Sequence, residues 1–248
     1  MNPQHRTLKI KDSVAVVTGA NRGIGLAFVK GLLERGARKV YAAGRDTAAL
    51  DAIVALDRAR VVPLQLDLLD PKQIREAAAK TGAIDLLVNN AGVAAFGSIL
   101  NGSIEMVERD MQTNYFGTLN VIRAFAPQIE KSGGGAIVNL LSVVSLANMP
   151  ALGGYSASKA ASWSMTQAVR AELAKKNISV HAVFPGPVDT DMAKGIDLPK
   201  TSPQDVARAV LDGVESGQDD ITPDSMSRDV HGAWLKDPKG VERQFGTM

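Results

Sequence analysis

The stretch at residues 14–35 constrains the fold of this chain more than any other. Residues 14–17, Val-Ala-Val-Val, form a short, continuously apolar run, which is typical of a strand buried on both faces of a parallel sheet. A glycine-containing segment at residues 18–25, Thr-Gly-Ala-Asn-Arg-Gly-Ile-Gly, follows at once. Residues 26–35 then show helical spacing before Gly36. The sequence therefore predicts a strand, a glycine turn and a helix.

This turn is typical of a dinucleotide-binding site. Glycines permit a tight turn and let phosphates approach the backbone, while the helix N-terminus offers unpaired N–H groups and a partial positive charge. The spacing is G-x-x-x-G-x-G rather than the commoner G-x-G-x-x-G. A glycine-rich turn without a ligand is the alternative, and the flanking strand and helix argue against it.

Strand and helix patterns alternate along the rest of the chain. We expect strands at residues 39–43, 61–66, 84–88, 136–141 and 179–184, and helices at residues 47–57, from Pro71 onward and at 103–131. Such alternation predicts an α/β fold with a single-domain, doubly wound parallel sheet of the Rossmann type and helices on both faces. We expect one domain over residues 1–248, with a core at 12–222 and a C-terminal tail at 223–248.

Composition and charge exclude several classes of protein. The 248 residues are 45% hydrophobic and 22% charged, which is ordinary for a soluble globular chain. A net charge of +2 from dispersed lysines and arginines gives no sign of nucleic-acid binding. Cysteine is absent, which excludes disulfides and is compatible with the cytoplasm, the location we expect. No apolar run is long enough for a membrane helix, so we expect neither export nor membrane anchoring.

The end of the second predicted strand indicates which nucleotide binds. An acidic residue about twenty residues after the glycine turn normally binds the adenosine ribose of NAD. Gly44 and Arg45 stand there instead, and Arg45 can pair with a 2′-phosphate that Arg22 reaches from the opposite side. This favours NADP(H) over NAD(H). Asp46 is the rival ribose ligand, but it is also well placed to N-cap the helix at 47–57.

Polar residues follow three other predicted strands, at the edge where ligands bind in such sheets. Asp67 follows the third strand and could reach the adenine, Asn89 and Asn90 follow the fourth, and Ser142 follows the fifth. Each of these residues has an alternative role in a turn or a helix cap.

Tyr155 and Lys159 form the candidate catalytic pair, because residues four apart share one helix face. A fixed cation favours the phenolate, and a downward pKa shift of about three units corresponds to roughly 4 kcal/mol. Such a tyrosine could act as a general acid or base. Alone, this pattern also fits an amphipathic helix with a solvated lysine. The loop from Ser142 is long enough to return the helix beside the strand end, which would bring the three groups together.

With these motifs in one chain, the sequence resembles the short-chain dehydrogenase/reductase family over roughly residues 12–222. The motifs are TGANRGIG at 18–25, NNAG at 89–92, YSASK at 155–159 and PGPVDT at 185–190. The resemblance implies that Tyr155 donates or accepts the proton, that Lys159 lowers its pKa and binds the nicotinamide ribose, and that Ser142 holds the substrate oxygen. It also implies that Asn114 completes a proton relay to Lys159 through water.

The resemblance further implies contacts of Asp67 and Leu68 with adenine, and of Val188 and Thr190 with nicotinamide. Asn90 would steady the central sheet and line the cofactor site. The cofactor-binding residues that we expect are Gly19, Asn21, Arg22, Gly23, Ile24, Gly25, Arg45, Asp67, Leu68, Asn90, Ala91, Gly92, Tyr155, Lys159, Pro185, Gly186, Val188 and Thr190.

The predicted function is that of an NADP(H)-dependent oxidoreductase of the carbonyl reductase or alcohol dehydrogenase type. The loops at 93–100, 143–154 and 191–201 are largely small or apolar, so we expect a small, mainly apolar carbonyl or alcohol substrate. The three histidines lack other candidate ligands around them, and we expect no metal site. The alternatives are a cofactor-binding sensor or scaffold with little catalysis, and a sugar-nucleotide epimerase, which usually needs an additional C-terminal substrate domain.

The C-terminal part departs from the family pattern. Family members that form tetramers commonly finish with a seventh strand and a short tail that packs across a subunit axis. Here residues 219–223 are only a short strand candidate, and a polar tail follows at 224–248. We expect a homodimer through the helices after Ser103 and after Tyr155, by family analogy, more than a tetramer. The tail either caps the substrate pocket or is loosely ordered.

Overall fold

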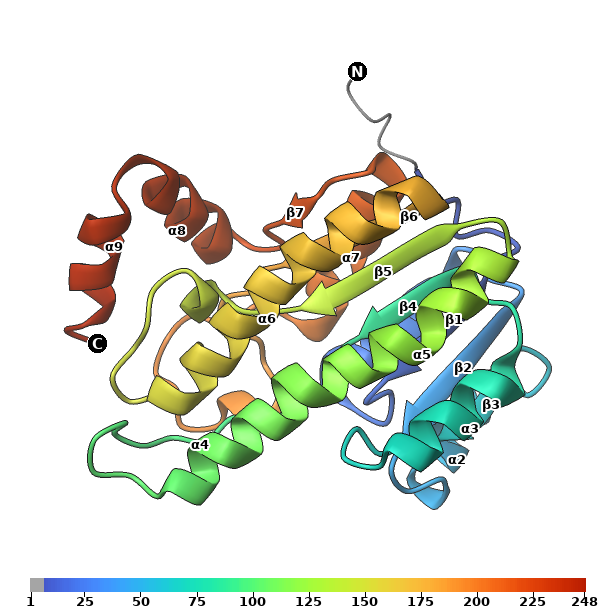
Figure 1. Cartoon of the computed structure of the whole chain (residues 1–248), viewed down its shortest axis with the longest axis horizontal. Helices are drawn as coiled ribbons and strands as arrows, with labels where there is room; N and C mark the ends of the chain where they lie inside the picture. Colours follow the sequence, from blue (N-terminus) through green and yellow to red (C-terminus); the bar gives the residue numbers. More distant parts are fainter. Residues whose placement is uncertain (1–6) are drawn as a thin grey trace.

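The computed structural model describes residues 7–248, which form an α/β fold around one parallel sheet (Figure 1). The strand order in this 7-stranded sheet is β3-β2-β1-β4-β5-β6-β7, and every pair of neighbours is parallel. The predicted doubly wound sheet is therefore confirmed. The strands are β1 (Val14–Thr18), β2 (Lys39–Gly44), β3 (Val61–Gln65), β4 (Leu86–Asn89), β5 (Gly135–Leu140), β6 (Ile178–Val183) and β7 (Asp220–Ile221).

Helices cover both faces of the sheet, as predicted. In chain order they are α1 (Gly23–Glu34), α2 (Asp51–Val54), α3 (Pro71–Thr81), α4 (Ile104–Asp110), α5 (Thr118–Lys131), α6 (Gly153–Leu173), α7 (Pro203–Ser216), α8 (Ser225–Lys236) and α9 (Pro238–Phe245). Short 3-10 turns occur at Ala48–Leu50, Val143–Ser145, Ala174–Lys176 and Asp191–Ala193. No helix within residues 7–248 is both long and apolar enough to span a membrane.

The alternation of side chains along β1 divides the core into two layers. Ala15 and Val17 belong to the layer that packs against α1 and α7, while Val14 and Val16 belong to the layer that packs against α3, α5 and α6. All of these strand residues are buried, so the strand reads as a continuous apolar run. The sheet is consequently enclosed on both faces and open to ligands only along its edges and ends.

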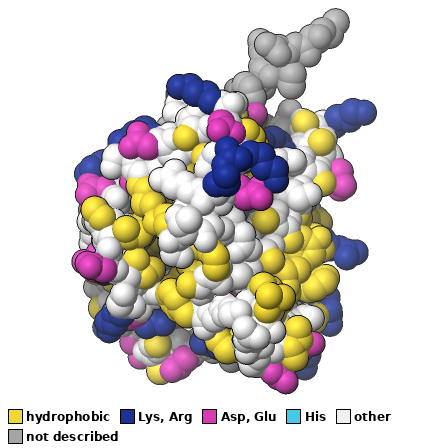
Figure 2. All heavy atoms as spheres, turned by 90° about the vertical axis from the view of Figure 1, so that its left-hand side faces the viewer, with side chains coloured by type: hydrophobic (Ala, Val, Ile, Leu, Met, Phe, Trp, Pro, Cys, Tyr) yellow, Lys and Arg dark blue, Asp and Glu magenta, His cyan; other side chains and the backbone are white. Residues whose placement is uncertain are grey.

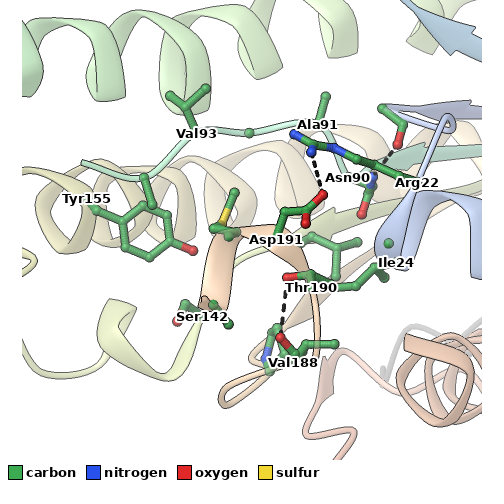
Figure 3. Close-up of a pocket in the computed structure, with 18 of the residues that line it drawn as sticks. Arg22, Ile24, Asn90, Ala91, Val93, Ser142, Tyr155, Val188, Thr190 and Asp191 are labelled. Carbon is green, nitrogen blue, oxygen red and sulfur yellow. Dashed lines mark hydrogen bonds and ion pairs between the residues drawn. The ribbon is translucent and has the colours of Figure 1, made fainter. Parts of the chain in front are cut away.

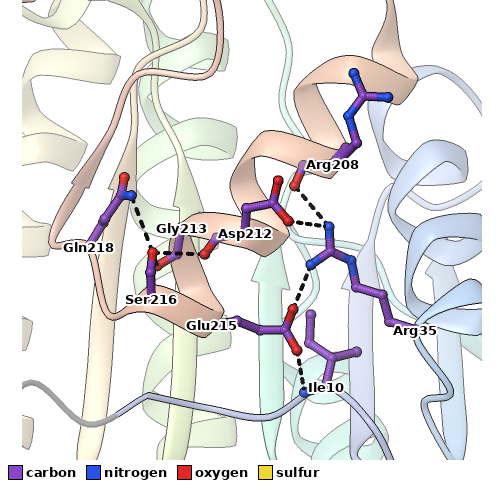
Figure 4. A network of polar contacts seen from close by, with 8 residues as sticks. All are labelled: Ile10, Arg35, Arg208, Asp212, Gly213, Glu215, Ser216 and Gln218. Atoms are coloured by element: carbon purple, nitrogen blue, oxygen red, sulfur yellow. Dashed lines mark hydrogen bonds and ion pairs between the residues drawn. The ribbon is translucent and has the colours of Figure 1, made fainter.

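An ion-pair network joins α1 to α7 at the end of the sheet away from the glycine turn (Figure 4). Arg35 follows α1, and its guanidinium bonds Asp212 and Glu215 at 2.6 Å each. Glu215 also accepts a hydrogen bond from the backbone N–H of Ile10 at 3.3 Å. The network therefore ties the segment that leads into β1 to the two helices that cover one face.

The predicted helix at 47–57 is wrong in its length. A 3-10 turn leads into α2, which ends at Val54. The carboxylate of Asp57 accepts hydrogen bonds from the backbone N–H groups of Ala59 and Arg60 and from the Arg60 guanidinium. These bonds stabilise a turn in place of another helical turn, because aspartate competes for backbone donors.

The predicted helix at 103–131 exists but is not uniform. A π-helical segment at Met111–Gly117 separates α4 from α5. The periodicity of apolar residues does not show this segment, because one wide turn displaces the pattern by only about one residue.

The tail is ordered rather than loose. It forms α8 and α9, which begin at the capping residues Asp224 and Asp237, and Pro238 occupies the first turn of α9. The short strand candidate at 219–223 becomes β7, which pairs with β6.

Candidate active site

A cavity of about 1010 Å³ lies beyond the carboxyl ends of the strands, where the loops after β1, β2, β4, β5 and β6 meet (Figure 3). Arg22 and Ile24 lie at one side of this cavity, and Tyr155 and Ser142 lie at the other. All the predicted site residues line the cavity except Gly25 and Asn114, which lie directly behind it. One pocket thus joins the expected cofactor and catalytic groups.

The glycine turn makes the floor of the cavity because no side chain would fit there. Gly19 and Gly23 have φ values of +65° and +54°, a region that glycine adopts without strain. A Cβ on Gly19 would lie 3.0 Å from Cα of Ala91, and one on Gly25 would lie 2.0 Å from the carbonyl oxygen of Gly19. Gly25 therefore lets α1 pack tightly against the turn, and its predicted role in binding is indirect.

Asn90 joins the glycine turn to the end of β4. Its amide nitrogen donates to the carbonyl oxygens of Thr18 at 2.9 Å and Gly19 at 3.2 Å. The hydroxyl of Thr18 in turn accepts hydrogen bonds from the backbone N–H groups of Asn90 and Ala91 at 3.0 Å each. This network fixes the spacing between two loops that line the cavity.

The end of β2 presents basic and acidic side chains to the cavity. Arg45 is exposed and lines it. Asp46 also lines it, and its carboxylate accepts a hydrogen bond from the backbone N–H of Ala48 at 2.9 Å, which is a turn at the start of the helical segment. Arg22 points to Asp191 in the loop after β6, with the charged groups 2.6 Å apart. In this structure Arg22 therefore bonds an acidic side chain rather than facing Arg45.

Ser142 lies two residues beyond the end of β5, has an extended backbone and caps the 3-10 turn Val143–Ser145. Its hydroxyl accepts from the N–H of Val144 at 3.3 Å, while its own N–H donates to the hydroxyl of Ser145 at 3.2 Å. The cap orients the Ser142 hydroxyl at the cavity wall. The same hydroxyl acts on the Tyr155 phenol and lowers its pKa.

The geometry of Tyr155 and Lys159 corrects the expected pKa shift of the tyrosine. Burial raises the pKa of Tyr155 to about 12, against a smaller lowering by the Ser142 hydroxyl. Burial also lowers the pKa of Lys159 to about 8. The ammonium donates to the carbonyl oxygen of Leu140 at 2.7 Å and lies 5.7 Å from the centre of the Tyr155 ring. Desolvation therefore dominates the pKa of the phenol, and the prediction of a lowered tyrosine pKa is wrong for this state.

Asn114 lies in the π-helical segment and links the loop after β4 to α6. Its amide oxygen accepts from the N–H of Val93 at 2.9 Å, and its amide nitrogen donates to the Val93 carbonyl and the Ser158 hydroxyl. A Cβ on Gly92 would lie 3.0 Å from this amide oxygen and 3.6 Å from Nζ of Lys159. Asn114 and Lys159 thus approach the same point behind Gly92.

Several residues near the site carry no signal in the sequence. Asp110 is fully buried in α4, and one of its carboxylate oxygens accepts from the N–H of Ala95 at 3.1 Å. Burial raises the pKa of Asp110, and its charge acts on both Tyr155 and Lys159. Met226 of α8 lines the cavity although it lies far along the chain from every motif. A single acidic residue in an amphipathic helix and a methionine in a polar tail have no distinguishing pattern.

The cavity fits a dinucleotide. The bare backbone at Gly19, Gly23 and Gly92 leaves room at the floor, and α1 directs its N-terminal N–H groups toward the turn. Apolar side chains such as Val144, Met149 and Leu152 line the same cavity as Ser142 and Tyr155. In the described residues, no group of three or more His, Asp or Glu is placed to hold a metal ion.

Comparison with known proteins assigns the family. Residues 13–200 match the family model described as short chain dehydrogenase. The chain is 38% identical to a short chain dehydrogenase from Burkholderia cenocepacia J2315, solved in complex with NADP, with a TM-score of 0.91 and coverage of 96% of this chain and 99% of that one. An uncharacterized oxidoreductase of Staphylococcus saprophyticus is 34% identical over 82% of this chain and 92% of its own length.

A further relative carries a substrate in its name. A 3alpha-hydroxysteroid dehydrogenase of Mediterraneibacter gnavus is 34% identical over 76% of this chain and 79% of its own length. The fold, the glycine turn and these matches all point to one family. The chain belongs to the short-chain dehydrogenase family of oxidoreductases.

Proposed function

We propose that this protein is an NADP(H)-dependent carbonyl reductase or alcohol dehydrogenase that acts on a small, mainly apolar substrate. One observation carries the proposal: Ser142, Tyr155 and Lys159 line the same cavity as the glycine turn. A dinucleotide whose phosphates rest on that turn would extend along the cavity toward these three groups. A protein that only bound the nucleotide would have no need of all three.

The preference for NADP(H) rests on Arg45, and on Arg22 once it exchanges Asp191, its partner in this structure, for a phosphate. Both line the cavity near the end of β2 or the glycine turn, where a 2′-phosphate would lie. Asp46, the rival for the ribose, already accepts a backbone hydrogen bond from Ala48. The similar Burkholderia enzyme, crystallised in complex with NADP, supports the same choice.

Proton transfer is the step that the chain's own residues perform. When bound, the nicotinamide supplies or takes up the hydride at the carbonyl carbon. Tyr155, with its pKa raised to about 12, keeps its proton at neutral pH and can donate it to the carbonyl oxygen. The hydroxyl of Ser142 stabilises the charge that develops on that oxygen. The buried ammonium of Lys159 would bond the nicotinamide ribose beside the phenol.

The substrate end of the cavity favours apolar compounds. Its wall includes side chains from the loops after β4, β5 and β6 and from α8: Val93, Ala94, Phe96, Val143, Val144, Met149, Leu152, Met192, Ile196, Leu198 and Met226. Methionines adapt their shape to a bound molecule, so such a wall suits apolar substrates of varied outline. The name of the Mediterraneibacter relative, a hydroxysteroid dehydrogenase, is consistent with this class.

Replacing Tyr155 with phenylalanine tests the catalytic role. We expect Tyr155→Phe to lower the turnover number by about 10² or more, because general acid catalysis contributes 10²–10⁴-fold. The affinity for NADPH should stay nearly unchanged. The assay measures NADPH consumption with a panel of aldehydes and ketones. Tyr41→Phe is the matched control, since Tyr41 lies in the core with its hydroxyl near the Thr81 carbonyl. Wild-type turnover by Tyr155→Phe contradicts the role.

Replacing Arg45 with aspartate tests the nucleotide preference. We expect Arg45→Asp to shift the ratio of kcat/KM for NADPH and NADH toward NADH, because the new carboxylate repels a 2′-phosphate and can bond a ribose. Arg58→Asp, an exposed arginine outside the cavity, is the matched control. An unchanged ratio in Arg45→Asp removes this residue from the phosphate site.

A further inference from the structure

Asp224 joins the C-terminal helices to the loop that follows β6. It is 5% exposed and stands at the start of α8. One carboxylate oxygen, Oδ1, accepts from the N–H of Ser227 at 2.8 Å and caps the helix. The other, Oδ2, accepts from the N–H of Gly186 at 2.9 Å. The same side chain therefore serves a helix end and a loop that lines the cavity.

The bond to Gly186 is one of several that hold this loop: farther along, the N–H of Asp189 donates to the Thr201 carbonyl at 2.9 Å, and the Pro187 carbonyl accepts from the N–H of Thr201 at 3.0 Å. Gly186 lies between Pro185 and Pro187, and proline has no backbone N–H. Gly186 consequently supplies the backbone donor of this tripeptide, and the donor goes to Asp224. The Pro185 carbonyl accepts from the N–H of Val143 at 3.1 Å, which links the same tripeptide to the loop after Ser142.

Packing around Gly186 leaves little room for the loop to move toward α8. A Cβ on Gly186 would lie 3.1 Å from Oδ1 of Asp224 and 3.3 Å from Sδ of Met226. Two residues farther along, Val188 begins the part of the loop that lines the cavity together with Thr190. The Gly186 peptide thus fixes the start of this part of the cavity wall, and the pairing of Val188 with Thr201 fixes its continuation.

The rest of the C-terminal segment supports the other side of the site. Val241 and Phe245 of α9 are buried against Val143, Val144 and Ala147, which belong to the segment after Ser142. Figure 1 shows α8 and α9 together at one end of the molecule, beyond the end of β5. The segment that follows β7 therefore contacts both loops that border the proposed nicotinamide and substrate positions.

We propose that Asp224 is a positioning residue for the nucleotide: its bond to the Gly186 N–H places the loop of Val188 and Thr190 against the nicotinamide end of the cofactor. This inference rests on the proposed function. A capping role alone would leave the loop independent of Asp224. The two roles are separable, because only the Gly186 bond reaches the cavity.

The test compares variants that lose the cap, the loop bond or both. Asp224→Ala loses both. Asp224→Ser keeps a good N-cap residue but has too short a side chain to reach Gly186. Asp237→Ala is the matched control, since Asp237 caps α9 through Gly240 and does not line the cavity. Asp224→Ser carries the test if Asp224→Ala is not recovered in folded form.

Two measurements that do not depend on catalysis test the positioning role. The first is the dissociation constant of NADPH by fluorescence titration without substrate, which we expect to rise about tenfold in both Asp224 variants, the factor that corresponds to about 1.4 kcal/mol. The second is amide hydrogen exchange of the peptide containing Gly186 in the nucleotide-free protein, which should become faster in both. Asp237→Ala should lower Tm without changing either readout.

The outcomes separate this inference from the proposed function. If wild-type protein binds NADPH and the Asp224 variants bind it equally well with unchanged exchange at Gly186, the positioning role is wrong and the function stands. If wild-type protein does not bind NADPH, the proposed function itself fails. Faster exchange and weaker binding confined to the Asp224 variants support the role.

Discussion

Tyr155 and Lys159 are neighbours whose acidities move in opposite directions, for one physical reason. Desolvation disfavours the charged form of each group, so it raises the pKa of the phenol to about 12 and lowers that of the ammonium to about 8. At neutral pH both groups therefore carry their protons. The protonated phenol can donate its proton to a carbonyl oxygen when the reaction runs toward reduction.

The pH dependence of carbonyl reduction follows from these two values. Because the Lys159 ammonium exists below a pKa of about 8 and is lost above it, kcat/KM should be level near pH 6–7 and fall as the pH rises through about 8. Ionisation of Tyr155 should not add a second fall in kcat/KM near pH 8, since its pKa is about 12. Lys159→Arg, which keeps its charge, should lose the limb near pH 8. A profile that stays level to pH 10 in wild-type protein would contradict this assignment.

Asp110 gives a second prediction at the scale of one residue. Its charge raises the pKa of Lys159, so Asp110→Asn should move the basic limb of kcat/KM to lower pH. Burial raises the pKa of Asp110 itself, so its ionised form destabilises the fold at neutral pH, and this effect fades as the pH falls through the folded pKa.

Asp110→Asn should therefore unfold at higher denaturant concentration than wild type at pH 8, by a margin that shrinks toward pH 4. Urea unfolding at both pH values checks the stability, and initial rates across pH check the limb. The conservative variant Asp110→Glu keeps the charge and serves as the control. A margin that grows as the pH falls would show that the carboxylate is stabilising.

At this scale the motif residues could be located from sequence, and their electrostatics could not. Gly19, Asn90 and Ser142 follow strands of a parallel sheet, so their order along the chain places them at one edge. The pKa of Tyr155 depends on how much of the phenol is desolvated and where the Lys159 ammonium points. Both depend on packing that no local spacing encodes.

Among the elements, α1 and α7 are joined by a network that can be removed at one side chain. Arg35→Ala breaks the ion pairs with Asp212 and Glu215, while Glu215 keeps its hydrogen bond from the Ile10 N–H. We expect a loss of about 1 kcal/mol in the free energy of unfolding, since two partly exposed pairs share one arginine, and a smaller loss at high salt.

Urea unfolding at low and high salt measures the effect of Arg35→Ala. Arg208→Ala is the matched control, because its pair with Asp205 is more exposed and is local to α7. We expect less than about 0.5 kcal/mol from that control. Equal losses in the two variants would show that the bridge between the helices adds nothing beyond a surface ion pair.

The periodicity of apolar residues does not predict the π-helical segment or the two tail helices. The π-helical segment at Met111–Gly117 keeps the apolar face nearly in register, so a continuous helix fits the same residues. In the tail, the buried residues are Ser227 in α8 and Val241 and Phe245 in α9, which are too few to show a clear apolar stripe. Their burial comes from contacts with each other, with the segment after Ser142, and with Trp163 and Phe184.

For the molecule as a whole, the outer face of α5 and α6 is the expected contact between two copies. A shallow groove there is lined by Tyr115, Leu119, Ile122, Arg123, Ala126, Met165, Ala168, Val169, Glu172 and Leu173. Arg123 and Glu172 give the groove charges of both signs, which suits pairing with an identical surface about a two-fold axis. We propose a homodimer through this face.

A single bulky charge in the groove tests the dimer. Ala168→Arg should halve the mass measured by light scattering after size exclusion, because an unpaired charge in an apolar contact is costly. Ala79→Arg makes the same change on an exposed position of α3, away from the groove, and should leave the mass unchanged. A wild-type monomer, or a dimer that survives Ala168→Arg, would place the contact elsewhere or remove it.

Hydrophobic side chains are also visible on the side of the molecule where α4 and the C-terminal helices lie, interrupted by polar atoms (Figure 2). Phe96, Ile99, Leu100 and Ile104 are exposed in the loop before α4 and at its start. Phe96 also lines the cavity, so part of this apolar surface leads to the substrate end.

The cavity wall has one consequence for how enzymes of this type diverge. The match to the family model ends at residue 200, yet Met226 lines the same cavity. Changes in a few late residues can therefore reshape the acceptor's surroundings while every part that grips the coenzyme stays as it is. Relatives that use the same nicotinamide coenzyme should therefore still differ in the substrates that they oxidise or reduce.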